Sequence, residues 1–93
     1  MVKNNINNKL LDLCIHQQIQ DSLNFIKIIE IQIKYTKDRL ELLEINKPLC
    51  FQKKKVYEYE TEKNELELKL KNNYKQLEEE LKIIEKLQSN INN

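Results

Sequence analysis

Few residues in this chain could do chemistry, and their spacing favours no active site. His16 is the only histidine, and it follows Cys14 by two residues, with no second pair to complete a zinc site. On a helix, side chains two residues apart point in widely different directions, so this pair cannot share a ligand or act as nucleophile and base. We therefore expect no catalysis, no metal and no cofactor, and a partly exposed His16.

Glycine is absent from all 93 residues. Loops that hold phosphate groups need glycine for close backbone approach, so P-loop and dinucleotide-binding sites are excluded. The two cysteines, Cys14 and Cys50, would lie roughly 50 Å apart along straight helices, too far for a disulfide within one hairpin. We expect both thiols to be free and reduced.

Charge is abundant but balanced, with a formal net charge of +1. Such a balance predicts neither a nucleic-acid nor a membrane partner, and no apolar run approaches the ~20 residues that span a bilayer. One basic run, Lys53 to Lys55, could bind an acidic tail or phosphates. We favour a solvated face balanced by Glu58, Glu60 and Glu62. A cytoplasmic location is the default expectation, with the nucleus possible.

The elements that must position these residues are two long helices with heptad-spaced apolar residues. Spacings of three and four recur on both sides of Pro48, the only proline, which is typical of a coiled coil. The pattern predicts a hairpin seam made of Ile15, Ile19, Ile26, Ile29, Ile33, Leu40, Leu43, Val56, Tyr59, Leu66, Leu70, Leu77, Ile84 and Leu87.

The fold class predicted is all-α: an antiparallel two-helix coiled-coil hairpin within a larger helical assembly. It is a single domain over 1–93, with helix 1 at about 8–45, a turn at about 46–51 and helix 2 at about 52–89. Asn46 would close helix 1 with a left-handed cap. A strand at 26–35 and one unbroken, dimerising helix are the alternatives.

The register of the hairpin can also be argued. The preferred register sets Ile29 opposite Leu70 and groups Thr36 with Lys63 in one polar layer. A rival register sets Ile29 opposite Lys63. The two differ by one heptad, which keeps the same residues on the seam.

Apolar residues are more numerous than one seam can bury. Cys14, Ile28, Tyr35 and Leu42 repeat at one heptad position away from the seam. Repeated apolar surface of this kind typically marks an interface. We expect these four residues to bind a protein partner.

The segment LELKLKNNYKQLEEELKIIEKLQSNI resembles the C-terminal helix of β-class prefoldin subunits, and HQQIQDSLNFIKIIEIQIKY is similar to their N-terminal helix. The resemblance implies a chaperone subunit that holds unfolded proteins at its helix tips, here Ile6, Leu10, Leu11, Leu87 and Ile91. Prefoldin helices are joined through β-strands, whereas about five residues join them here.

These observations predict a non-enzymatic coiled-coil subunit that mediates assembly of a larger protein complex. A prefoldin-like chaperone and a freestanding homo-oligomeric coiled coil are the alternatives. The expected partners are other proteins, and a hetero-oligomeric complex is expected in preference to a homo-oligomer. No nucleic acid, membrane or small molecule is expected as a partner.

Overall fold

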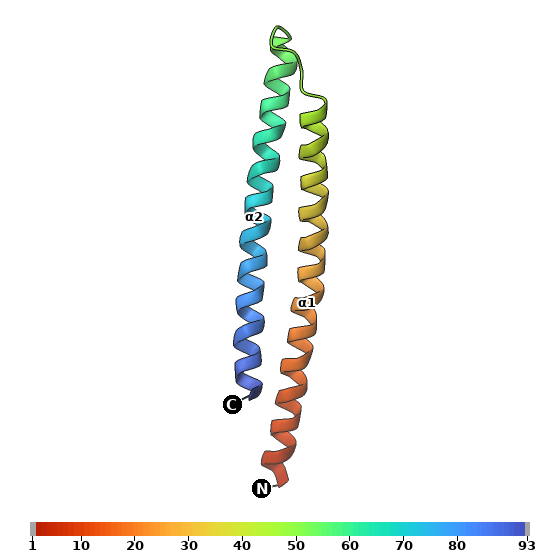
Figure 1. Cartoon of the computed structure of the whole chain (residues 1–93). Coiled ribbons are helices and arrows are strands. Elements are labelled where there is room, and N and C mark those ends of the chain that lie inside the picture. The colour runs from red at the N-terminus through yellow and green to blue at the C-terminus, as the bar shows by residue number, and fades with distance from the viewer. Residues whose placement is uncertain (1, 93) are drawn as a thin grey trace.

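The protein is a hairpin of two long antiparallel helices, seen in a computed structural model that describes residues 2–92 and the side chains of residues 9–91 (Figure 1). Helix α1 (Val2–Ile45) has 44 residues and α2 (Lys53–Asn92) has 40. The molecule measures 78 × 15 × 14 Å. The all-α hairpin is as predicted. Residues 26–35 are helical, and the chain breaks between the helices, so neither alternative fold is observed.

Both helices are longer than predicted at their free ends. Helix 1 was predicted to begin at about residue 8, but α1 begins at Val2, and α2 continues past residue 89 to Asn92. These end segments contain many asparagines but no proline or glycine. Once a helix has nucleated, each added residue gains one backbone hydrogen bond, so weak helix formers extend it when no breaker intervenes.

Asn46 ends α1 through its side chain rather than through its backbone conformation. Its backbone N–H and its Nδ2 both donate to the carbonyl oxygen of Leu42, each at 3.0 Å. No residue with positive φ occurs in the described part of the chain, so the predicted left-handed cap is wrong. The amide side chain instead adds a second hydrogen bond to the Leu42 carbonyl, which already accepts from the backbone N–H of Asn46.

Gln52 starts α2, which therefore begins at Lys53, one residue later than predicted. The backbone N–H of Val56 donates to the carbonyl of Gln52 at 2.9 Å, which is the first hydrogen bond of the helix. The Gln52 side chain accepts from the backbone N–H of Leu49 at 3.0 Å, and the Gln52 N–H donates to the Leu49 carbonyl at 2.9 Å. This reciprocal pair closes the turn that follows Pro48.

One cross-helix contact shows that both predicted registers are wrong. The Nζ of Lys37 lies 5.4 Å from the ring centroid of Tyr74. The preferred register would set Tyr74 opposite Phe25, about 18 Å along the axis from Lys37 at 1.5 Å per residue. The rival register would set it opposite Gln18, which is farther still. A lysine and a tyrosine side chain cannot bridge either offset.

The contacts fit a third register. It differs from the preferred register by one heptad, in the direction opposite to the rival register. Lys69 lies 6.0 Å from the ring of Tyr35, and His16 and Ile19 line one groove with Gln88 and Ile91. The heptad pairing closest to these contacts sets Ile29 opposite Leu77 and Ile19 opposite Leu87. Figure 1 agrees, because α2 extends past α1 at the loop and α1 extends past α2 at the free ends.

Cysteine crosslinking tests this register. In a Cys14→Ser, Cys50→Ser background, Ile19→Cys with Leu87→Cys should be joined within one chain by a short bismaleimide. Ile19→Cys with Glu80→Cys should react far less, because Glu80 lies about 10 Å farther along α2. Gel mobility and intact mass measure the yield. Preferential linkage of the Glu80 pair would restore the register first predicted.

Candidate protein-binding surface

The seam between α1 and α2 accounts for one face of each helix. Five isoleucines and Tyr59 form the buried core: Ile15, Ile26, Ile29, Ile33, Ile84 and Tyr59. The other predicted seam residues are half-buried: Ile19, Leu40, Leu43, Val56, Leu66, Leu70, Leu77 and Leu87. This narrow core leaves most of the remaining apolar side chains in solvent.

A second apolar face follows the length of α1. Phe25, Ile28, Ile31, Tyr35, Leu42 and Ile45 are each exposed, from 41% for Phe25 to 70% for Ile45. Spacings of three and four place them on one side of the helix, apart from a single gap at Asp38. We call these six residues the α1 stripe.

The α1 stripe contains three of the four residues that were expected to bind a partner, Ile28, Tyr35 and Leu42. The fourth, Cys14, is exposed nearer the free end. Phe25, Ile31 and Ile45 complete the face, and none of these three was among the residues expected to bind a partner. A helical-wheel projection that included the two neighbouring heptad positions would have identified them.

One edge of the stripe is fixed against α2 by charged contacts. Arg39 donates from Nε to Oε1 of Glu62 at 2.9 Å, and its Nη2 forms an ion pair with the same oxygen, also at 2.9 Å. Lys69 lies over the ring of Tyr35 on the same side of the hairpin. The side chains that make both contacts are exposed, so the contacts contribute little to stability and mainly show how the two helices are oriented. They leave the outer edge of the stripe uncovered within the described chain.

A hydrogen bond near the loop links the helices on the opposite side. Tyr59 Oη donates to Glu44 Oε2 at 2.7 Å. This bond lowers the pKa of Glu44 from its ordinary 4.5 and raises the pKa of Tyr59 from its ordinary 10.0. Its stabilising effect is therefore lost as pH falls through the Glu44 pKa or rises through the Tyr59 pKa, and it operates between them.

Of the polar residues on the seam, three have buried polar atoms, and they differ in how those atoms are paired. Thr36 is fully buried and donates from Oγ1 to the carbonyl of Gln32 at 2.8 Å. Asn73 is 4% exposed, and its Nδ2 has no partner among the described residues. Glu80 Oε2 is likewise buried without a donor. Unpaired polar atoms in a core are costly, so Asn73 and Glu80 are weak layers.

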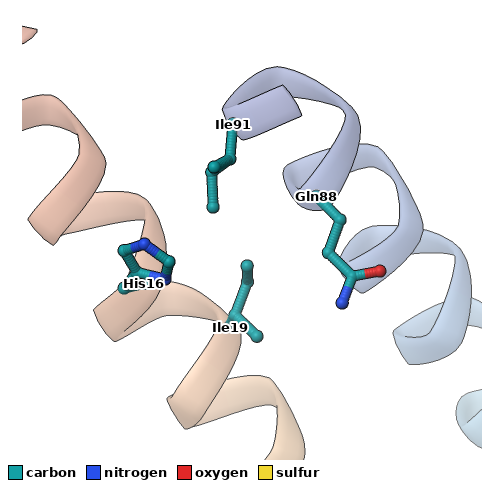
Figure 2. Close-up of a pocket in the computed structure, with 4 residues that line it drawn as sticks. All are labelled: His16, Ile19, Gln88 and Ile91. Carbon is teal, nitrogen blue, oxygen red and sulfur yellow. The ribbon is translucent and has the colours of Figure 1, made fainter. Parts of the chain in front are cut away.

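A groove of about 400 Å³ opens between the helices near their free ends, lined by His16, Ile19, Gln88 and Ile91. Figure 2 shows Ile19 and Ile91 directed into the space between the two helices. His16 is exposed at its edge, as the sequence predicts. No cluster of three metal-ligating side chains occurs among the described residues.

The loop end of the hairpin carries the basic run that was noted in the sequence. Lys53, Lys54 and Lys55 form the first turn of α2, where the helix dipole disfavours cations. The only ion pair in the described chain joins Arg39 to Glu62. The expected balance by Glu58, Glu60 and Glu62 is therefore not made by direct contacts.

No known family model, curated protein or solved structure matches this chain. Neither helix, over the residues described, is long and apolar enough to cross a membrane.

Proposed function

We propose that this protein is a non-enzymatic helical subunit that joins a larger protein complex by packing the α1 stripe against a helix of a partner. The observation that carries this proposal is the stripe itself: six exposed apolar side chains on a helix whose opposite face is already buried. A helix that is apolar on two faces is typical of bundles with more than two helices.

The area of the stripe is sufficient for a stable contact. Six side chains that each expose roughly 100 Å² present about 600 Å² of apolar surface. Apolar atoms make up about 60% of a typical interface, so the full contact would be roughly 1,000 Å², above the ~800 Å² per partner of standard complexes. The length and spacing of the stripe suit a helical partner, whose side chains can interdigitate at positions three and four apart.

The triple variant Ile28→Gln, Tyr35→Gln, Leu42→Gln tests the proposal. Each side chain exposes roughly 100 Å², of which glutamine keeps the apolar stem, so each replacement should cost at least about 1 kcal/mol of association free energy. Their combined loss should weaken association about 100-fold and leave helicity almost unchanged. Sedimentation equilibrium measures self-association, and affinity capture with quantitative mass spectrometry measures binding of fixed partners.

The matched control changes the same kinds of residue on α2. Leu68, Tyr74 and Leu81 are exposed at 59%, 43% and 52%, but lie on α2 away from the stripe. Their replacement by glutamine should leave association intact. Equal binding by both triple variants, or a wild-type monomer that captures no fixed partner, would contradict the proposal.

A chaperone of the prefoldin type is the second candidate, and the exposed leucines near the free end of α1 favour it. Leu10 and Leu11 are 56% and 58% exposed, whereas Leu87 and Ile91 are half-buried. The side chain of Ile6, also expected at the tip, lies outside the described residues. Suppression of client aggregation that is lost in Leu10→Gln, Leu11→Gln but kept in the stripe variant would support this function instead.

A further inference from the structure

The loop end of the hairpin combines unusual apolar exposure with positive charge. Phe51 is the most exposed large apolar side chain in the described chain, at 73%, and Leu49 beside it is 59% exposed. Both lie in the connection between the helices, at one extremity of the rod (Figure 1). Ile45 and Tyr57, at 70% and 71%, lie on the adjoining helix ends. We call residues 45–57 the hairpin tip.

Charge is distributed unevenly between the hairpin tip and the rest of the two helices, which we call the shaft. The tip contains Lys47, Lys53, Lys54 and Lys55 and no aspartate or glutamate, so its formal charge is +4 in a chain of net +1. The shaft is therefore net negative. The net charge of +1 predicted no membrane partner. It is, however, the sum of a strongly basic tip and a net negative shaft.

The acidic side chains nearest the tip do not neutralise it. Glu44 accepts the hydrogen bond of Tyr59, and Glu62 is paired with Arg39. Glu58 and Glu60 form no ion pair, and none of the tip lysines has a carboxylate within 4 Å among the described residues. Lys53, Lys54 and Lys55 thus remain available to an external anionic surface, whereas Lys47 lies close enough to Glu44 for its charge to help lower the pKa of that carboxyl.

We propose that the hairpin tip binds the surface of an anionic lipid bilayer. Leu49 and Phe51 enter the boundary between headgroups and acyl chains, and the four lysines bind the headgroups around them. Apolar side chains at an apex with lysines at their base suit this interface, because lysine stems lie along apolar surface while their charges stay in water. Each lysine near such a surface strengthens binding roughly fivefold.

This orientation is compatible with the proposed protein-binding function but does not depend on it. Most of the α1 stripe lies along the shaft, away from Leu49 and Phe51. A hairpin held by its tip would project from the membrane and leave the shaft accessible to a partner. An acidic protein could also bind four lysines, but it would not by itself explain two large apolar side chains at the apex.

Cys50 provides a probe within the tip, since it is exposed between Leu49 and Phe51. In the full chain carrying Cys14→Ser, Cys50 is labelled with an environment-sensitive fluorophore. The labelled protein is mixed with vesicles of phosphatidylcholine alone or of phosphatidylcholine and phosphatidylserine. We expect a blue-shifted, brighter emission and co-sedimentation only with the vesicles that contain phosphatidylserine.

Two tip variants and one matched control define the contact. Replacement of Lys47, Lys53, Lys54 and Lys55 by glutamine should weaken vesicle binding at least 100-fold. Leu49→Ser, Phe51→Ser should abolish the blue shift. Circular dichroism checks that both variants remain helical. Replacement of the exposed shaft lysines Lys71, Lys75, Lys82 and Lys86 by glutamine removes the same charge and should leave binding unchanged.

Several results would overturn the proposal. These are failure of the wild type to bind phosphatidylserine vesicles, equal binding to neutral vesicles, or equal losses in the tip and shaft lysine variants. A fluorescence change with polyglutamate but not with vesicles would assign the tip to an acidic protein instead. Loss of complex formation in the stripe variant with vesicle binding intact would separate this site from the proposed partner surface.

Discussion

Replacing Ile29 with alanine is expected to unfold most of the hairpin at temperatures where the wild type is folded. Ile29 is 1% exposed and is the most buried apolar side chain in the described chain. Truncating such a residue costs about 2–5 kcal/mol, because apolar contacts are lost and a cavity remains. A domain of this size has only about 5–14 kcal/mol of total stability, and a two-helix core belongs at the low end.

The expected fall in melting temperature is more than 10 °C, measured by circular dichroism at 222 nm across a series of protein concentrations. Leu13→Ala is the matched control. It removes a side chain of the same size from the same helix, but Leu13 is 65% exposed and lies off both the seam and the α1 stripe. Its effect should be within about 1 kcal/mol. Equal losses at both positions would show that the seam is not the stabilising core.

Replacing Asn73 with leucine is expected to stabilise the isolated chain. Asn73 is buried in the seam, and its Nδ2 donor is unpaired within the described chain. Removing an unsatisfied buried donor and adding apolar contact should contribute about 1–3 kcal/mol, which corresponds to a rise in melting temperature of roughly 5–15 °C. The adjacent variant Asn72→Leu has the same change in helix propensity at an exposed position.

Asn72→Leu should therefore shift the melting temperature by no more than a few degrees. If Asn73→Leu were destabilising while Asn72→Leu was neutral, the amide would have to find a hydrogen-bond partner in solution, as in an assembly with a second chain. A single polar residue on a coiled-coil seam often selects register. The crosslinking pairs at Ile19, repeated in Asn73→Leu, would reveal any loss of register specificity.

Much of the architecture could be predicted from residue types and spacing. The heptads identified two helices and the seam faces, and Pro48 placed the break between them. All fourteen predicted seam residues are buried or half-buried. Such patterns are informative because each apolar residue in a helix has a fixed angular position, so burial of one face follows from the spacing.

The helix ends and the α1 stripe were predicted less completely. Helix propensity underestimated the length of both helices at their asparagine-rich ends, because extending an established helix costs less free energy than starting one. The four expected partner residues occupied one heptad position, whereas the exposed face also includes residues from two adjoining positions. The exposure of Leu49 and Phe51 could not be deduced from the pattern either, because it depends on where the loop lies relative to both helices.

By itself, the sequence determined that this protein is a helical hairpin, which residues form its seam and that apolar surface remains outside it. Only the tertiary structure decided the register, because a slip of one heptad leaves every seam face unchanged. Residues 46–52 place the start of α2 beyond the end of α1, and the cross-helix contacts then favour the pairing of Ile29 with Leu77. The same turn gathers four lysines and the exposed Leu49 and Phe51 at one end, a juxtaposition that the near-neutral total charge concealed.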